Sequence, residues 1–318
     1  MVSKIIFLGT AGDSQVAGKQ MRASGGIILQ IDELQFHLDP GPGALVRAAQ
    51  NDINLRANTA VLVSNSSLLN CNDVNAVIDA MTYGGTDRNG VLVANNTLVN
   101  GTEESKPFLT KLHQSFVERI IVLNKGQKLA IEDIEIHALP TIHPDPNAVG
   151  FKFLAPEFTL VYSSDTGYSK ELVKEYMGAD ILILNVSEPG SEKAEYWLNS
   201  DTATRIIQEV NPKLAIITHF GIKMLKSDPL YEGREMQKKT NIQVIAAKDG
   251  MGIVPGSYAA RSKQKRLGGF KKSGTGGLKI EEIREEPKQE SNLGDLGQEP
   301  AEEESEKPKN EHQKHLDF

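Results

Sequence analysis

Three residues in the second half of the chain have side chains that could bind a metal ion. His143, in "LPTIHPDPNAVGF", and His219, in "AIITHFGIKM", each follow an apolar run, and Asp165, in "LVYSSDTGYS", follows another. Loops at strand ends allow a rigid sheet to direct side chains into a cleft. Two imidazoles and one carboxylate suit zinc or another divalent transition metal. Spacing alone leaves a second interpretation open, in which the histidines are surface or hydrogen-bonding residues.

Short strands and amphipathic helices would position these residues. The strands come in clusters typical of antiparallel pairing, each followed by one or two helices, which is not the alternation of a Rossmann sheet. We therefore expect an α/β protein with two sheets and helices outside them. The predicted strands are Lys4–Leu8, Gly26–Ile31, Leu34–Leu38, Thr59–Val63, Ile120–Val122, Ile134–Ala138, Gly150–Phe153, Thr159–Ser163, Ile181–Asn185, Ala215–Thr218 and Val244–Ala246. The predicted helices are Gly43–Asn51, Asp73–Met81, Lys106–Arg119, Ser169–Met177, Asp201–Val210 and Leu230–Lys239, with Asp73 and Asp201 at N-cap positions.

Composition limits the class of protein. The 318 residues are enough for one large domain or two small ones, and the 39% that are hydrophobic can form a core. The single cysteine, Cys71, excludes an internal disulfide and suits a reducing cytosol, so we expect a cytoplasmic protein. No apolar run approaches the ~20 residues of a membrane helix, and we expect no membrane partner. The net charge of −7 argues against nucleic-acid binding through bulk charge.

The composition changes near residue 255. Residues 1–255 carry the apolar runs and predict one folded domain, whereas residues 256–318 are rich in Lys, Glu, Gly, Ser and Pro and predict a disordered tail. The segment 261–280 is basic, with seven cations and no acids, and in the segment 281–318 thirteen acids outnumber five Lys and Arg. The tail is then either a solvated segment or a basic arm for RNA, DNA or an acidic partner, shielded by its acidic half.

The order of motifs in residues 1–254 resembles the metallo-β-lactamase fold of hydrolases. The segments that carry the resemblance include "IIFLGTAGDSQVAGKQMRASGGIILQID", "FHLDPGPGALVR", "HPDPNAVGF", "VYSSDTGYS", "LAIITHFGIKM" and "VIAAKDGM". The opening segment is most similar to the branch that holds the tRNA 3′-processing endonucleases (RNase Z) and their archaeal-type relatives. The resemblance implies a four-layer αββα sandwich with a dinuclear site, usually zinc, at one edge of the sheets. Family members use a metal-bound hydroxide to attack an ester, thioester, amide or phosphodiester.

The segment "VLVSNSSLLN" lies where the family carries the motif His-x-His-x-Asp-His. Asn65 and Ser67 stand at the two leading histidines, Leu69 at the aspartate and Asn70 at the last histidine. The strand before this loop and the helix after it keep the frame of the motif. The resemblance therefore implies that all four metal ligands of this loop are replaced.

The other ligands that the resemblance implies are present. His143 matches a ligand of the first metal, Asp165 the bridging carboxylate and His219 a ligand of the second metal. Asp39, in "HLDPGPG", matches an aspartate that supports the site from the preceding strand. A further histidine that is common in this branch is missing, because no histidine lies between His143 and His219.

These replacements favour a catalytically impaired pseudoenzyme with a binding or regulatory role. The candidate partners are a ligand or RNA in the former active-site cleft, an active paralogue, or a second copy of the chain. Asn and Ser are poor zinc ligands, and Leu69 cannot serve as a base. The alternative is an active mononuclear metal hydrolase of a phosphodiester or an ester, RNA included, in which His143, Asp165 and His219 hold one divalent metal, with zinc as the expected ion. A third hypothesis is a structural role within an assembly.

The remaining chemical side chains are expected to be structural. Cys71 adjoins the altered loop, but we expect it to be a small buried filler. His37 and His137 alternate within predicted strands, and His113 falls in a predicted amphipathic helix. The segment "GGTDRNG" precedes no predicted helix, so a phosphate cradle is not expected there.

Overall fold

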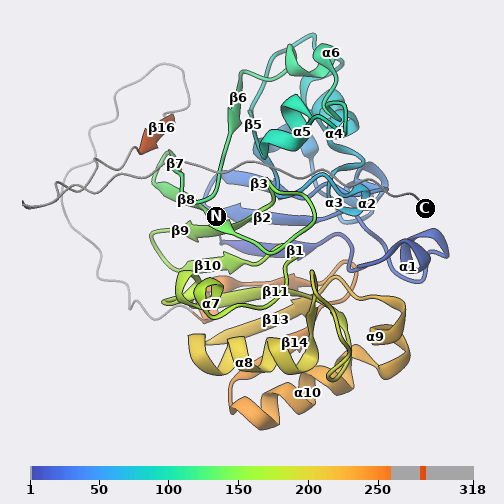
Figure 1. The fold of residues 1–318 in the computed structure, drawn as a ribbon. Coiled ribbons are helices and arrows are strands. Elements are labelled where there is room, and N and C mark those ends of the chain that lie inside the picture. The colour runs from blue at the N-terminus through green and yellow to red at the C-terminus, as the bar shows by residue number, and fades with distance from the viewer. Residues whose placement is uncertain (1, 259–279, 284–318) are drawn as a thin grey trace, which may run out of the picture. The chain divides into compact units, whose positions relative to one another are not determined.

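The computed structural model describes residues 2–258 and 280–283. The chain divides into two compact units, residues 1–284 and residues 285–318, and every described residue belongs to the first unit. The strands of this unit form two sheets, and helices lie on the outer face of each (Figure 1).

The first sheet has seven strands, antiparallel at one end and parallel at the other. In spatial order they are β15 (Gly252–Ile253), β1 (Lys4–Phe7), β2 (Ile27–Ile31), β3 (Leu34–Leu38), β4 (Asn58–Val63), β5 (Val91–Ala94) and β6 (Arg119–Val122). The pairs from β15 to β3 are antiparallel, and those from β3 to β6 are parallel. β4 and β5 are apolar over most of their length because both faces of these strands are buried.

The second sheet has nine strands and the same mixed character. Eight of them follow the order β14 (Gln243–Ala246), β13 (Leu214–Thr218), β11 (Ile181–Glu188), β10 (Thr159–Tyr162), β9 (Val149–Leu154), β8 (Ile134–Pro140), β7 (Lys128–Ile131) and β16 (Ile280–Ile283). The short strand β12 (Leu198–Asn199) pairs with β11 outside this order. β10, β11, β13 and β14 pair in parallel, whereas β7 to β10 pair antiparallel.

The largest apolar cluster lies between the two sheets. It contains Phe36 of β3 and Phe153 of β9, whose ring centroids are 5.8 Å apart in an edge-to-face contact. Edge-to-face pairing of this kind adds to the stabilisation from buried area. The inner faces of the two sheets therefore pack directly against each other.

Two further clusters bind the helices to the outer faces of the sheets, which gives four layers (Figure 1). The helical elements between the strands of the first sheet are α1 (Ser14–Gly18), α2 (Ala44–Gln50), the 3₁₀ turn η1 (Leu55–Ala57), α3 (Leu68–Cys71), α4 (Val74–Thr82), α5 (Asn96–Asn100) and α6 (Lys111–Gln114). The second sheet carries α7 (Lys170–Tyr176), α8 (Ser200–Val210), α9 (Ile222–Ser227) and α10 (Pro229–Thr240). The 3₁₀ turn η2 (Pro255–Ser257) follows β15 of the first sheet. The predicted αββα sandwich is confirmed.

The predicted helix Lys106–Arg119 is wrong. Helical structure there is limited to α6, and β6 begins at Arg119. The backbone N–H groups of Phe108 and Leu109 both donate to the carbonyl of Leu98, and that of Glu118 donates to the carbonyl of Gly90. Long-range backbone pairing has replaced the local helix. The strands β5 and β7 were not predicted, because each has four residues and gives a weak local signal.

Two predicted helix caps act differently in the structure. Asp73 precedes α4, but its Oδ2 accepts from the N–H groups of Gly43 and Ala44, 2.9 Å away, at the start of α2. The N-cap of α8 is Asn199 rather than Asp201, and Asn199 and Thr202 form a capping box. The carboxylate of Asp73 therefore connects the start of α4 to the start of α2 instead of capping α4.

Residues 280–283, which belong to the predicted tail, form the strand β16. β16 pairs antiparallel with β7, so residues 280–283 extend the second sheet. The rest of the predicted tail beyond residue 258 lies outside the described residues, and its disorder stays a prediction. Within residues 2–258 and 280–283, none of the helices has the length and apolar character needed to cross a bilayer.

Candidate functional site

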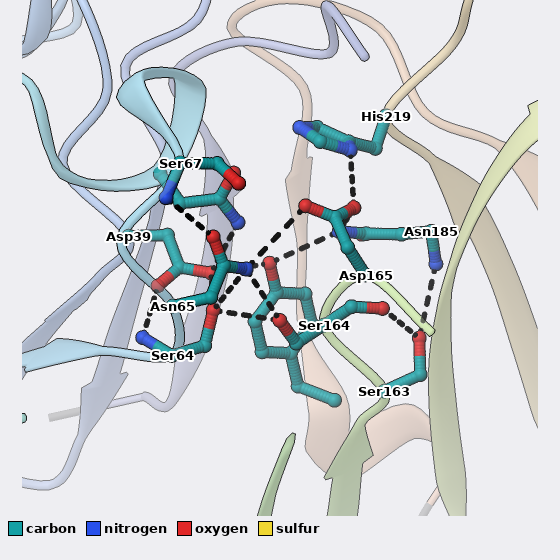
Figure 2. Close-up of polar contacts among 11 residues, drawn as sticks. Asp39, Ser64, Asn65, Ser67, Ser163, Ser164, Asp165, Asn185 and His219 are labelled. Carbon is teal, nitrogen blue, oxygen red and sulfur yellow. Dashed lines mark hydrogen bonds and ion pairs between the residues drawn. The ribbon is translucent and has the colours of Figure 1, made fainter. Parts of the chain in front are cut away.

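The candidate site lies at one edge of both sheets, where residues from the ends of several strands face one another (Figure 2). Asp39 follows β3 and Ser64 follows β4, both in the first sheet. Asp165 follows β10, Asn185 lies in β11 and His219 follows β13, all in the second sheet. Because neighbouring parallel strands end at the same edge, residues that are far apart in the sequence come together here.

Three residues of the site have backbone conformations that side chains other than glycine disfavour. The φ angles of Asp39, Ser164 and His219 are 49°, 57° and 61°. The left-handed region costs a non-glycine residue roughly 1–2 kcal/mol. Strain of this kind concentrates at functional sites, where surrounding contacts hold it in place.

Asp39 accepts more hydrogen bonds than Asp165, the other buried carboxylate of the candidate site. It accepts hydrogen bonds from the backbone N–H of Ser64 at 2.7 Å, the hydroxyl of Ser64 at 2.7 Å, the amide of Asn70 at 3.1 Å and the hydroxyl of Tyr162 at 2.7 Å. Burial raises the pKa of Asp39 to about 6, although the bonds from Ser64 and Tyr162 oppose this rise. Asp39 is thus a buried, saturated acceptor that supports the loop after β4.

Two serine hydroxyls connect the sheets beside Asp39. Ser164 donates to the Oγ of Ser64 across 2.6 Å. The amide nitrogen of Asn65 donates to both hydroxyl oxygens, at 3.2 Å to Ser64 and 3.3 Å to Ser164. The backbone N–H of Ser67 donates to Oδ1 of Asn65 at 2.9 Å. This last bond fixes the orientation of the Asn65 amide, so its nitrogen must face the site.

Asp165 receives donors on both of its oxygens. Asn185 donates to Oδ1 at 2.9 Å, and Asn65 makes a long contact of 3.5 Å to Oδ2. Nδ1 of His219 lies 2.7 Å from Oδ1 as an ion pair without the alignment of a good hydrogen bond. Burial raises the pKa of Asp165, but the interaction with His219, the hydrogen bond from Asn185 and the charge of His143 together outweigh burial and lower the pKa to about 2.

The contacts close into a ring that spans the two sheets. Asn185 donates to the hydroxyl of Tyr162 at 3.3 Å, and Tyr162 donates in turn to Asp39. The ring runs through Asp39, Ser64, Asn65, Asp165, Asn185 and Tyr162. Buried polar contacts therefore connect the loops of the two sheets at this edge.

His219 and Asp165 behave as a coupled pair. Burial lowers the pKa of His219, but the carboxylate of Asp165 opposes burial and raises the pKa above its ordinary value. The pair therefore favours a protonated imidazole beside an ionised carboxylate. This arrangement can hold a positive charge at the edge of the sheets.

His143 lies next to a second polar centre that is built on Asp145. The N–H of Asp145 donates to Nδ1 of His143 at 3.0 Å. Neutral His143 then carries its proton on Nε2, which makes Nε2 a donor. Burial lowers the pKa of His143, although Asp165 and Asp145 oppose that shift, so the neutral form is favoured.

Asp145 anchors the loop that follows β4. Its carboxylate accepts from the backbone N–H of Ser66 at 3.0 Å, the hydroxyl of Ser66 at 2.8 Å, the amide of Asn95 at 2.7 Å, the hydroxyl of Thr97 at 2.6 Å and the N–H of Asn147 at 3.0 Å. Burial raises the pKa of Asp145, but these bonds outweigh burial and lower it. Three loops are thus held by one carboxylate.

The four positions where the resemblance implies metal ligands have separate places in the structure. Asn65 and Asn70 are buried members of the polar network. Ser67 is the N-cap residue of α3, and its side chain makes no cap bond. Leu69 is half-buried and packs against the apolar cluster of Ala11 and Val16. These two positions thus have a structural role.

A small cavity adjoins the ring, with both polar and apolar residues in its lining. Its volume is about 20 Å³, and Asp39, Asn70, Asn185 and His219 are among the residues that line it. Oδ1 of Asn70 and Oδ1 of Asn185 are buried without a hydrogen-bond partner. Both amide nitrogens face carboxylates, so both oxygens must point elsewhere. The cavity has room for about one water-sized group.

The residues present do not fit the dinuclear metal site that the resemblance implies. Among the residues that the structure describes, no group of three or more His, Cys, Asp or Glu could hold a metal ion. Both oxygens of Asp165 accept from protein donors, and neutral His143 presents a donor at Nε2. His219 does keep an arrangement typical of metal ligands, with its other ring nitrogen beside a carboxylate.

Sequence reasoning identified Asp39, Asn65, Asp165 and His219 at this edge but missed several partners. Ser64, Ser164, Tyr162 and Asn185 carry no chemical motif, and only the pairing of the strands brings them together. Asp145 was detectable, because it lies two residues after His143 in a loop that follows a strand.

The other candidate residues occupy structural positions. His37 is buried, and its Nε2 lies 2.8 Å from the carbonyl oxygen of Gly25. His137 pairs with Glu135 at 2.5 Å on the same strand, and His113 lies 3.8 Å from Asp79. Cys71 is fully buried, and burial raises the pKa of its thiol to about 12. A thiol with so high a pKa is a poor nucleophile or metal ligand.

Comparison with known sequences gives two matches. Residues 35–220 match the family model described as a beta-lactamase superfamily domain. The chain is 32% identical over 252 residues to the uncharacterized protein MJ1374 of Methanocaldococcus jannaschii, an alignment that covers 79% of this chain and 94% of the relative.

Comparison with solved structures shows the same fold. The metallo-β-lactamase fold protein YhfI from Bacillus subtilis superposes with a TM-score of 0.67 at 19% identity, covering 80% of this chain and 99% of YhfI. A diphosphatase of the PhnP family superposes with a TM-score of 0.58 at 18% identity, covering 79% and 97% of the two chains. The short form of human tRNase Z superposes with a TM-score of 0.58 at 15% identity, covering 79% and 98%.

Proposed function

The chain belongs to the metallo-β-lactamase superfamily, and on this premise we propose that it is a catalytically impaired member with a binding or regulatory role. The observation that carries the proposal is the position of Asn65. Its amide nitrogen lies inside the ring and faces Asp165 and Ser164, where the family motif places a metal-binding histidine. An amide N–H is a hydrogen-bond donor and cannot coordinate a cation.

The ring supports the proposal because its donors satisfy the carboxylates that a metal would otherwise neutralise. Asp39 accepts from four protein donors, and Asp165 accepts from Asn185 and Asn65 and pairs with His219. Buried carboxylates need hydrogen-bond donors or cations. Here side chains of the protein supply most of the donors, and His219 supplies the charge.

The size of the cavity supports the same conclusion. A volume of about 20 Å³ is far smaller than the roughly 300–1,000 Å³ of a typical small-molecule site. A binding role would then use the surface around this edge. The proposal includes three kinds of partner: a paralogue, a second copy of the chain, and an RNA or acidic protein that the basic segment 261–280 recognises. It also includes a cytoplasmic location.

The alternative is a mononuclear hydrolase that uses His143, Asp165 and His219. It requires a change at two of these three residues, because Nδ1 of His143 accepts from a backbone N–H and both oxygens of Asp165 are occupied. Such a rearrangement would break buried hydrogen bonds. Each buried donor or acceptor that is left without a partner costs about 1–3 kcal/mol. The geometry therefore favours the impaired protein.

Metal analysis of the purified full-length chain separates the two functions. We expect substoichiometric zinc, manganese and iron after equilibration with each ion and gel filtration. The turnover of bis-p-nitrophenyl phosphate and of p-nitrophenyl acetate should be no higher than that of the His219→Ala variant under the same conditions. The proposal fails if one equivalent of metal copurifies and is lost in His143→Ala, or if His219→Ala abolishes a measurable turnover.

A further inference from the structure

The strand β7 pairs with β8 on one side and with β16 on the other. In the register of β16, Ile280 is opposite Ile131, Glu281 opposite Ala130, Glu282 opposite Leu129 and Ile283 opposite Lys128. Among the residues that the structure describes, β16 is the last strand of this sheet. Without β16, the backbone N–H and C=O groups on that side of β7 would have no partner strand, as in any free sheet edge.

The residue types of β16 match the side chains of β7 poorly. Leu129 and Ile131 are fully buried between the two sheets, whereas Lys128 is half-buried. Because directly opposite residues share a face of the sheet, the acidic residue Glu282 stands at the core-facing position beside Leu129. On the other face, Ile283 stands beside Lys128. Backbone hydrogen bonds therefore contribute more to this pairing than the burial of apolar side chains.

The chain also holds β16 less closely to β7 than it holds β8. A turn of only Glu132 and Asp133 joins β7 to β8. In contrast, residues 259–279 separate β16 from the preceding described residue, Tyr258. The entropy that is lost when a loop closes increases with its length. Of the two strands beside β7, β16 is therefore the one that is displaced more easily.

β7 matches a second copy of β7 better than it matches β16. A two-fold axis through Ala130 would pair the two strands antiparallel, as in an isologous dimer. Leu129 of each copy would then be opposite Ile131 of the other, so the core-facing positions would both be apolar. Lys128 would come beside Glu132, which begins the turn after β7. β7 contains no proline and no bulge, two features that often protect a free edge.

We propose that the edge of β7 is a docking surface for a second copy of the chain, and that β16 occupies this surface in the monomer. When β16 is displaced, two copies join their second sheets through β7. The same backbone groups of β7 serve both pairings, so each pairing excludes the other. This edge contains no residue of the candidate site, so the proposal does not depend on whether that site binds a metal.

Sedimentation equilibrium of the full-length chain tests the proposal with a variant that carries Glu281→Pro and Glu282→Pro. Backbone N–H groups of successive strand residues point to opposite sides, so one of the two prolines removes a donor to β7. The control carries Glu281→Gln and Glu282→Gln, which removes the same two charges but keeps both N–H groups. We expect the dissociation constant of the dimer to be at least about tenfold lower in the proline variant than in the control.

Ala130→Lys, added to the proline variant, tests whether β7 forms the interface. This change places two lysines opposite each other at the two-fold axis, and like charges directly opposite each other destabilise paired strands. Ala130 is half-buried, so the ammonium group of a lysine can reach solvent in the monomer. We expect the dissociation constant to return to that of the control.

Circular dichroism of each variant checks that the fold is retained. Three results would overturn the proposal. The first is a proline variant that dimerises no more tightly than the glutamine control. The second is a dimer that Ala130→Lys leaves unchanged, because the interface would then lie elsewhere. The third is the formation of open-ended oligomers instead of dimers, because a two-fold interface closes on itself.

Discussion

The hydroxyl of Ser164 donates to the hydroxyl of Ser64 across 2.6 Å, and this contact joins two residues that are 100 positions apart. Ser64 follows β4 in the first sheet, and Ser164 follows β10 in the second. Ser64 passes the interaction on to Asp39 through its own hydroxyl. The contact therefore links the two sheets at the edge where the family places its metals.

Removing the hydroxyl of Ser64 should destabilise the fold. The Ser64→Ala variant leaves the carboxylate of Asp39 without one buried donor and Ser164 without its acceptor. Each group left unsatisfied costs about 1–3 kcal/mol, so we expect the free energy of unfolding to fall by roughly 2–4 kcal/mol. Urea denaturation followed by circular dichroism measures it. Ser14→Ala, at an exposed serine, should change it by less than about 0.5 kcal/mol, and equal effects in both variants would contradict the prediction.

Asp145 should be as important for stability as the residues of the ring, although it matches no ligand of the family. The Asp145→Asn variant keeps one acceptor oxygen but turns an amide nitrogen toward the donors of Ser66, Asn95 or Thr97. We expect a loss of roughly 2–4 kcal/mol in the free energy of unfolding. Thermal and urea denaturation would measure it, with Asp133→Asn, at an exposed position, as the control. A loss no larger than that of the control would show that the three loops are held by other contacts.

His37 should make the protein less stable in mild acid. Burial lowers its pKa from 6.5 to about 4, so the unfolded chain binds a proton between these pH values and the folded chain does not. The free energy of unfolding is therefore highest, as far as His37 is concerned, above pH 6.5. It falls by at most about 3 kcal/mol as the pH decreases toward 4.

The His37→Gln variant isolates this effect, because its amide can still donate to Gly25 while it cannot titrate. Asp39, with a pKa raised to about 6, has the opposite effect, since stability falls as the pH rises through that range. Asp39 is present in both proteins and cancels in the difference. The difference in unfolding free energy between wild type and variant should shrink from pH 7 to pH 4; a constant difference would refute the assignment.

Restoring the four ligands should return metal binding. We expect the variant with Asn65→His, Ser67→His, Leu69→Asp and Asn70→His to take up zinc, because the strand β4 before these positions and the helix α4 after them are in place. Restored ligands would compete with the ring for Asp165, so its stability without metal should fall. Inductively coupled plasma mass spectrometry of the full chain measures the uptake, and the variant without Leu69→Asp is the control. No uptake would show that the ring, rather than the ligand set alone, excludes the metal.

The order of short strands and helices, the four layers and the candidate residues Asp39, Asn65, Asp165 and His219 could be predicted from the sequence. The length and periodicity of apolar runs and the order of motifs are properties of the sequence itself, and they do not depend on which residues come into contact in the fold. The helix expected at Lys106–Arg119 failed because long-range backbone bonds to Leu98 and Gly90 replaced local ones. The cap at Asp73 failed for the same reason, since the distant N–H groups of Gly43 and Ala44 took its carboxylate. The cap at Asp201 failed for a local reason, because α8 begins earlier and Asn199 caps it.

The sequence by itself determined which residues stand at the four positions where the resemblance implies metal ligands, because residue identity in one loop is a local property. Only the tertiary structure decided what those positions do instead. Asn65 reaches Asp165 and Ser164, and Asp145 reaches the loop after β4, through contacts that span 79–100 residues. Hydrogen bonds depend on distances of about 3 Å and on direction. These distances and directions are set only when the two sheets pack against each other, so they cannot be read from the order of residues in the chain.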